Sequence, residues 1–240
     1  MGGSLYDCTP YTYAVSLGRA GFENNNTGLN NSWWADRELG RTYHGRSPLE
    51  NFHIRQGLEL MRGGESDVLG GCSADDRQTI TAYIIDAILD TDLAYHAKEC
   101  ARFKLKLDAG SSFARESEED QALLVNMCLK AADIANPAKS WRVYSPWIDC
   151  LFKEFYAQGD KELASDVQPA PFMNRNDDTT CPPKAQIGFI TYLMRPLMTE
   201  WARLVPRCEA FLGTLDVNLG LLAKWQVEIE AARASDTPPA

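Results

Sequence analysis

Residues 123–160 read LLVNMCLKAADIANPAKSWRVYSPWIDCLFKEFYAQGD, and this stretch decides the fold class. Apolar side chains recur every three or four positions in its first half, which is the spacing of an amphipathic helix. They are Leu124, Met127, Cys128, Ala131 and Ile134. Because Asn136 and Pro137 interrupt this pattern, the sequence predicts a helix over residues 118–134.

Helical patterns also cover most of the remaining chain. We predict helices over residues 47–61, 75–104, 145–159, 184–204 and 211–232, and a long surface loop over residues 166–183. Ser47 is expected to cap the first of these helices, with Glu50 completing a capping box. Ser145-Pro146 is expected to open the helix of residues 145–159, and Gly159 to close it. Residues 1–45, rich in Gly and Asn, are expected to be mostly loop. No segment alternates as a strand does, so the predicted fold class is all-α, a compact multi-helix domain.

Composition narrows the class of protein. The 240 residues can form one domain with a large core, and they carry a net charge of -9. Such an acidic chain is a poor candidate for nucleic-acid binding, which needs a basic face. Its seven cysteines are scattered without a C-x-x-C pair, which favours a reducing compartment and a cytoplasmic location. We expect no signal peptide, because no early segment has a charged start followed by an apolar run. We expect no membrane span, because no apolar run reaches about 18 residues.

Asp133 lies on the last turn of the helix predicted over residues 118–134. A carboxylate is unfavourable there, because the C-terminal end of a helix carries partial negative charge. One interpretation is an aspartate that is solvated or bonded to a nearby loop. The other interpretation is that a functional role keeps the Asp133 carboxylate at this position.

Four motifs around this position occur in a defined order. They are PLEN at 48–51, LDTDLAYH at 89–96, KAADIANP at 130–137 followed by Tyr144, Trp147 and Asp149, and KAQIGFI at 184–190 followed by Tyr192, Pro196 and Trp201. Together they resemble the catalytic domain of the class I 3′,5′-cyclic-nucleotide phosphodiesterases, from about residue 14 to residue 212. The resemblance implies one helical domain of the HD-superfamily type over residues 1–240, without the N-terminal helices of that family.

The resemblance also implies a reaction and its cofactors. Family members hydrolyse 3′,5′-cyclic AMP or GMP to the 5′-monophosphate in signal transduction, and they use two divalent metal ions (Zn, Mg or Mn). Asp133 matches one metal ligand of the family. Histidines and bridging aspartates suit such a site, because two ions close together need hard, deprotonated ligands. The implied partner is a small cyclic nucleotide, and a homodimer is left open.

Most of the family's metal ligands have no match in this sequence. The chain has three histidines in all, His44, His53 and His96, and no His-x-x-x-His pattern. Val15-Ser16 stand where the resemblance implies a His-Asp pair, and Arg19 stands where it implies another histidine. No proton-donating histidine is identified. We therefore expect weak hydrolysis or none.

Two residues match positions that hydrogen-bond metal-bound waters in the family, where such partners orient a site. They are Glu50 and Thr91. Glu50 is explained equally well as a capping-box acid. The alternative for Thr91 is a mid-helix threonine that bonds its own backbone.

The base-binding residues of the family are better matched. Gln186 matches the glutamine that contacts the purine edge, and an amide offers both a donor and an acceptor for that purpose. Phe189 lies one turn further on and could stack on the base, with Leu151 as the opposite wall. Asn136 and Tyr144 match further nucleotide-binding positions. The alternative is that Phe189 and Leu151 are core residues.

Two functional interpretations follow. The first is a metal-dependent cyclic-nucleotide phosphodiesterase. The second is a catalytically impaired relative that binds a nucleotide or acts as a scaffold. Because the Gln186 amide could turn either way, the sequence does not separate cAMP from cGMP.

Overall fold

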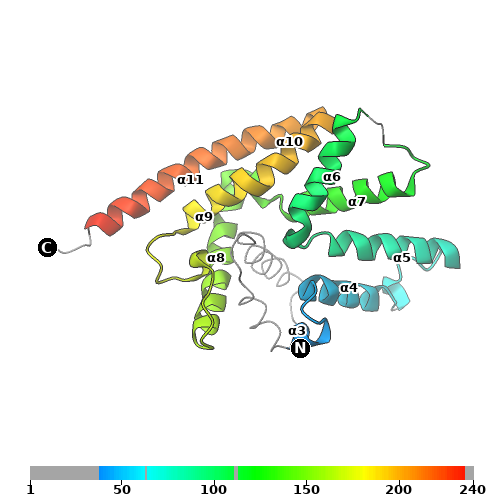
Figure 1. The fold of residues 1–240 in the computed structure, drawn as a ribbon, viewed down its shortest axis with the longest axis horizontal. Helices are drawn as coiled ribbons and strands as arrows, with labels where there is room; N and C mark the ends of the chain where they lie inside the picture. Colours follow the sequence, from blue (N-terminus) through cyan, green and yellow to red (C-terminus); the bar gives the residue numbers. More distant parts are fainter. Residues whose placement is uncertain (1–37, 63, 111–112, 236–240) are drawn as a thin grey trace. The chain divides into compact units, whose positions relative to one another are not determined.

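The computed structural model describes residues 38–62, 64–110 and 113–235 (Figure 1). Its contacts group the chain into two units, residues 1–133 and residues 134–240. Within the described ranges the structure consists of helices, turns and loops without a strand, which confirms the all-α prediction. No helix in these ranges is long and apolar enough to cross a membrane. Most of the loop predicted over residues 1–45 lies outside the described residues.

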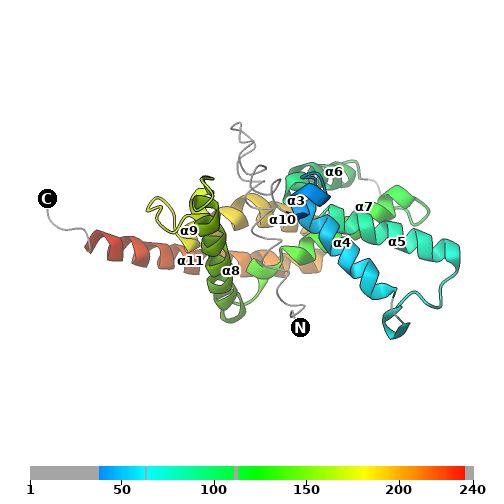
Figure 2. The same ribbon diagram turned by 90° about the horizontal axis from the view of Figure 1, so that it is seen from below.

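The first unit, as far as the structure describes it, is a group of helices between residues 38 and 133. Its elements are α3 (Glu38–Thr42), α4 (Pro48–Met61), η1 (Gly64–Ser66), α5 (Ala74–Leu89), η2 (Leu93–Tyr95), α6 (His96–Asp108) and α7 (Glu118–Asp133). α4 packs against α5, and α5 packs against α7 (Figure 1 and Figure 2). Phe103 of α6 and Met127 of α7 are fully buried and form part of its core.

α4 begins at Pro48, as predicted, but the capping box is wrong. Ser47 has a left-handed backbone (φ 41°) and makes no side-chain cap. Its hydroxyl instead donates to Oδ2 of Asp92 at 2.8 Å. Glu50 is almost fully buried, with 1% of its surface exposed. Without a bond from the Ser47 side chain to the first amides of α4, the reciprocal pair of bonds that defines a capping box is absent.

The long helix predicted over residues 75–104 is interrupted. α5 ends at Leu89 and α6 begins at His96, with η2 between them. Asp92 produces this break, because its Oδ1 atom accepts the backbone N–H of Ala94 at 2.9 Å and so starts a new turn. Periodicity continues across such a break, so the apolar pattern alone does not reveal it.

The second unit is built around α11. Its elements are η3 (Asn136–Ala138), α8 (Trp141–Leu163), η4 (Pro171–Met173), α9 (Pro182–Phe189), the π-helical turn η5 (Ile190–Met194), α10 (Arg195–Leu204), η6 (Pro206–Cys208) and α11 (Glu209–Ser235). α9 and α10 both pack along α11 (Figure 1). Leu215 and Leu222 of α11 are fully buried.

The predicted ends of the helix at residues 145–159 are wrong at both sides. α8 begins at Trp141, and Pro146 lies inside it near the N-terminus. Pro146 lies in the second turn, where it removes one helical hydrogen bond, the one that an N–H at this position would donate to the Arg142 carbonyl oxygen. α8 also continues past Gly159 to Leu163. Gly159 is needed for close packing rather than for ending the helix, because an added Cβ would lie 2.1 Å from the Met173 carbonyl oxygen.

The predicted surface loop over residues 166–183 is partly a packed segment. It contains η4 and extends to Pro182, where α9 begins. Ala170, Met173 and Cys181 are buried, so this segment contributes to the core of the second unit. Its close approach to Gly159 fixes it against α8.

Candidate functional site

The nucleotide-binding candidates are centred on a buried hydrogen bond in the second unit. Tyr144 of α8 donates its hydroxyl to Oε1 of Gln186 on α9, at 2.7 Å. Tyr144 is 1% exposed and Gln186 is 2% exposed. Burial raises the pKa of the Tyr144 hydroxyl above its ordinary value, so it remains a neutral donor. The bond holds the Gln186 side chain and leaves the N–H donors of Nε2 for another acceptor.

Phe189 and Leu151 lie on the same two helices. Phe189 follows Gln186 by one turn of α9, and Leu151 follows Tyr144 by two turns of α8. Both side chains are buried. Burial is expected for the walls of a purine site and for core residues alike, so the two interpretations of this pair both still stand.

Asn136 is the first residue of the turn η3, which precedes α8. This turn is held by Asn218 of α11. Nδ2 of Asn218 donates to the carbonyl oxygens of Pro137 at 2.7 Å and Lys139 at 2.8 Å. All five predicted nucleotide-binding residues thus lie in one unit, on η3, α8 and α9.

The metal-side candidates lie in the first unit. Asp133 is the last residue of α7 and is partly buried. Burial raises the pKa of its carboxyl to about 6, although the nearby Lys130 lowers it. Lys130 itself is fully buried, and its Nζ atom has no hydrogen-bond partner among the residues that the structure describes. Burial lowers the pKa of Lys130, opposed by Cys100, Asp90 and Asp133.

Thr91 and Glu50 lie on segments that meet near the end of α5. The Ser47–Asp92 hydrogen bond joins the start of α4 to the turn that contains Thr91. Thr91 is buried, and its Oγ1 atom donates to the Ile88 carbonyl oxygen at 2.7 Å. This is the backbone bond that the alternative interpretation expects, although Thr91 lies after the end of α5 and not within a helix. Thr91 therefore has a local structural role.

The described residues do not by themselves form a two-metal site. No three His, Cys, Asp or Glu side chains among them converge as metal ligands would. His96 is buried at the start of α6, where its Nε2 atom lies 3.5 Å from the Cys100 sulfur. His53 is partly buried, and burial lowers its pKa. Val15, Ser16 and Arg19 lie outside the described residues.

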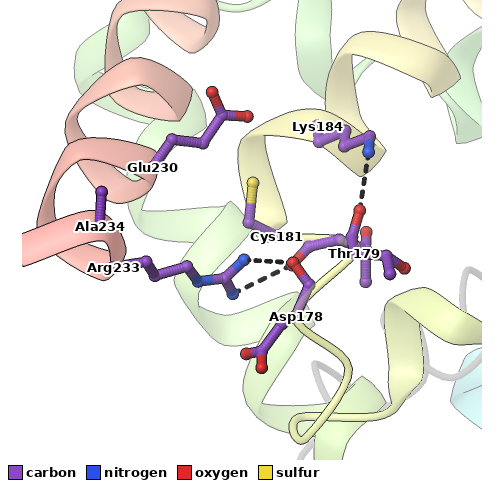
Figure 3. A pocket seen from close by; sticks show the side chains of 8 residues that line it. Asp178, Thr179, Cys181, Lys184, Glu230, Arg233 and Ala234 are labelled. Atoms are coloured by element: carbon purple, nitrogen blue, oxygen red, sulfur yellow. Dashed lines mark hydrogen bonds between the residues drawn. The ribbon is translucent and has the colours of Figure 1, made fainter. Parts of the chain in front are cut away.

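A separate pocket occupies the end of the second unit. It has a volume of about 510 Å³ and lies between the C-terminal end of α11 and the segment before α9 (Figure 3). Arg233 donates to the carbonyl oxygens of Asp178 and Thr180, and Lys184 donates to that of Thr179. None of the five predicted nucleotide-binding residues lines it. Its cations bind backbone carbonyls, so we do not assign the nucleotide site here.

Comparison with known protein families identifies the chain. Residues 12–215 match the family model of 3'5'-cyclic nucleotide phosphodiesterases. The chain belongs to this family. The match spans both units and contains every motif on which the resemblance was based, so that prediction is confirmed.

Individual phosphodiesterases show the same relationship. The chain is 33% identical over 187 residues to the human high affinity cGMP-specific 3',5'-cyclic phosphodiesterase 9A, covering 77% of this chain and 31% of the relative. It is also 33% identical over 187 residues to a Drosophila melanogaster 3',5'-cyclic-AMP phosphodiesterase, isoform F, covering 75% of this chain and 28% of the relative. The chain thus spans about a third of the length of the curated relatives it matches.

A solved structure supports the fold assignment. The phosphodiesterase domain of the Salpingoeca rosetta rhodopsin phosphodiesterase superposes with a TM-score of 0.76 at 26% sequence identity. The superposition covers 95% of this chain and 68% of that domain. The fold of the chain is therefore that of a phosphodiesterase catalytic domain.

Two buried polar residues were not found from the sequence. Lys130 stands in the KAADIANP motif, where a lysine near a helix end is usually exposed. Asn218 stands between Leu215 and Leu222 in a long helical pattern. A polar residue within an apolar stripe was the available signal for Asn218, but its partners lie some 80 residues away and are visible only in the structure.

Proposed function

We propose that the chain binds the base of a purine 3′,5′-cyclic nucleotide through Gln186, within a metal-dependent phosphodiesterase that hydrolyses it to the 5′-monophosphate. The buried Tyr144–Gln186 hydrogen bond carries this proposal. It holds the Gln186 amide and leaves the N–H donors of Nε2 available for a ligand. Phe189 follows one turn later on the same helix. An amide and an aromatic face are the groups that recognise the edge and the face of a purine.

The two related enzymes named above differ in substrate, one acting on cGMP and the other on cAMP. The hydroxyl of Tyr144 can donate to Oε1 of Gln186 or accept from Nε2, so it can hold the amide in either orientation. Both nucleotides are therefore candidates for this chain, and both belong in the test.

The test is a titration of the purified chain with cAMP and cGMP by calorimetry. Gln186→Ala is expected to weaken binding by about 10- to 100-fold, the range for losing one or two hydrogen bonds to a ligand. Gln56→Ala is the matched control, because Gln56 is an exposed glutamine on α4. Equal affinity of Gln186→Ala and the control would contradict the proposal.

A second candidate is nucleotide binding without turnover. It is favoured by the ligand set, because the described residues contain no three converging metal ligands and the resemblance puts Val15-Ser16 where it implies a His-Asp pair. Hydrolysis assays with added Mg²⁺, Mn²⁺ or Zn²⁺ distinguish the two candidates. Metal-dependent turnover that is lost in Asp133→Asn supports the phosphodiesterase, whereas Gln186-dependent binding without turnover supports the binding protein.

A further inference from the structure

Asn218 is the polar exception on the buried face of α11. It is 0% exposed and lies between the fully buried Leu215 and Leu222. Asparagine is a weaker helix former than leucine or alanine, and a buried amide must be hydrogen-bonded to be tolerated. A residue of this kind needs a reason other than the stability of its own helix.

Its hydrogen bonds provide that reason. Nδ2 donates to the Pro137 carbonyl oxygen within η3 at 2.7 Å and to the carbonyl oxygen of Lys139, the residue that follows η3, at 2.8 Å. The turn has few bonds of its own, namely those from the N–H of Ala138 to Ala135 and from the N–H of Lys139 to Asn136. A three-residue turn with so few internal bonds depends on outside contacts for a fixed position.

A second set of contacts runs from the same face of α11 to Gln186. Trp225, two turns after Asn218, packs edge-on against Trp141 with ring centroids 6.5 Å apart. Trp141 in turn packs edge-on against Tyr144 at 5.9 Å, and Tyr144 bonds Gln186. α11 thus contacts both the turn that carries Asn136 and the start of the helix that carries Tyr144.

We propose that Asn218 is a positioning residue for the nucleotide site. By holding the carbonyl oxygens of Pro137 and Lys139, it fixes the turn that presents Asn136 and from which α8 departs toward Tyr144. Asn218 itself does not touch the ligand. This inference rests on the proposed function, since it concerns the site around Gln186 and Asn136.

The experiment compares Asn218→Ala with Leu215→Ala. Leu215 is equally buried on α11 but makes no bond to η3, so its truncation controls for a loss of stability alone. Affinity for cAMP and cGMP is measured at a temperature at which circular dichroism shows all variants to be folded. We expect Asn218→Ala to weaken binding by about tenfold relative to Leu215→Ala, the effect of losing one hydrogen bond between the displaced Asn136 and the nucleotide.

Hydrogen exchange gives a readout that does not depend on a ligand. Amides of Ala138 and Lys139 should exchange faster in Asn218→Ala than in Leu215→Ala, and Asn218→Ser, which restores one donor, should be intermediate in exchange and affinity. Equal affinity and equal exchange in Asn218→Ala and Leu215→Ala would overturn the positioning role. If the unaltered chain binds neither nucleotide, the proposed function fails, and the nucleotide role of Asn218 fails with it. In that case, faster exchange at Ala138 and Lys139 in Asn218→Ala would show only that Asn218 anchors the turn η3.

Discussion

Lys130 is the most unusual single residue of the first unit, because a fully buried ammonium group is costly without a partner. Its Nζ atom has no hydrogen-bond partner among the described residues, and burial lowers its pKa below the ordinary value of 10.5, although the nearby carboxylates of Asp90 and Asp133 oppose the shift. The unfolded chain therefore holds the proton more tightly than the folded chain does. The free energy of unfolding is therefore not reduced by Lys130 above its unfolded pKa, where the amine is neutral in both states. It decreases as the pH falls from there through the lowered folded pKa, because protonation is then less favourable in the folded chain.

This linkage gives a prediction for Lys130→Met. At pH 7 the apolar replacement should raise the free energy of unfolding by about 1 kcal/mol or more, because a side chain of similar length removes the cost of burying an ionisable amine. The difference from the unaltered chain should shrink as the pH rises toward 10. Urea unfolding at pH 7, 8.5 and 9.5 measures it, with Lys224→Met at an exposed lysine of α11 as the control. A difference that does not change with pH would refute this account of Lys130.

At the scale of elements, the packing of α8 on η4 depends on a single glycine. A Cβ atom at Gly159 would lie 2.1 Å from the Met173 carbonyl oxygen and 2.9 Å from its carbon, both backbone atoms that cannot turn away. Gly213 of α11 is also a helical glycine, but a Cβ there meets nothing within 4 Å. Gly213 is therefore a matched control for Gly159, because both glycines are helical and only Gly159 lacks room for a Cβ atom.

We predict opposite effects of alanine at these two glycines. Gly159→Ala should lower the free energy of unfolding by about 2 kcal/mol or more, because the backbone must shift to accept the methyl group. Gly213→Ala should raise it by about 0.5–1 kcal/mol, the usual gain in an unhindered helix. Urea unfolding of both variants tests the prediction, and a stabilised Gly159→Ala would contradict the close approach of η4.

Local signals in the sequence located most helices but not all of their ends. Pro48 and the apolar spacing around Met127 placed α4 and α7 correctly, because these signals act within one or two turns. The break after Leu89 was missed because it depends on the Asp92 carboxylate bonding the Ala94 amide rather than on a glycine or proline. Gly159 was misread as a helix end because its role comes from Met173, on a different element.

At the scale of the whole molecule, the two candidate sites fall in different units. Asp133, Glu50 and Thr91 belong to residues 1–133, and the five nucleotide-binding candidates belong to residues 134–240. The family could be predicted from the sequence because its motifs occur in the expected order. The all-α fold could be predicted because apolar residues recur at helical spacing. The supporting bonds could not be predicted, since those of Asn218 and Tyr144 join residues 79, 81 and 42 positions apart. A single catalytic domain over residues 1–240 stays a prediction.

The central claim is that Gln186 recognises a purine base. Its most direct test is base selectivity, measured as the ratio of affinities for cAMP or cGMP over cytidine 3′,5′-cyclic monophosphate. The phosphate and ribose are the same in each ligand, so the ratio reports the base alone. We predict that the unaltered chain prefers one of the purine nucleotides by about tenfold or more, and that Gln186→Ala loses this preference. An unaltered chain without preference for a purine, or a preference that Gln186→Ala keeps in full, would contradict the account.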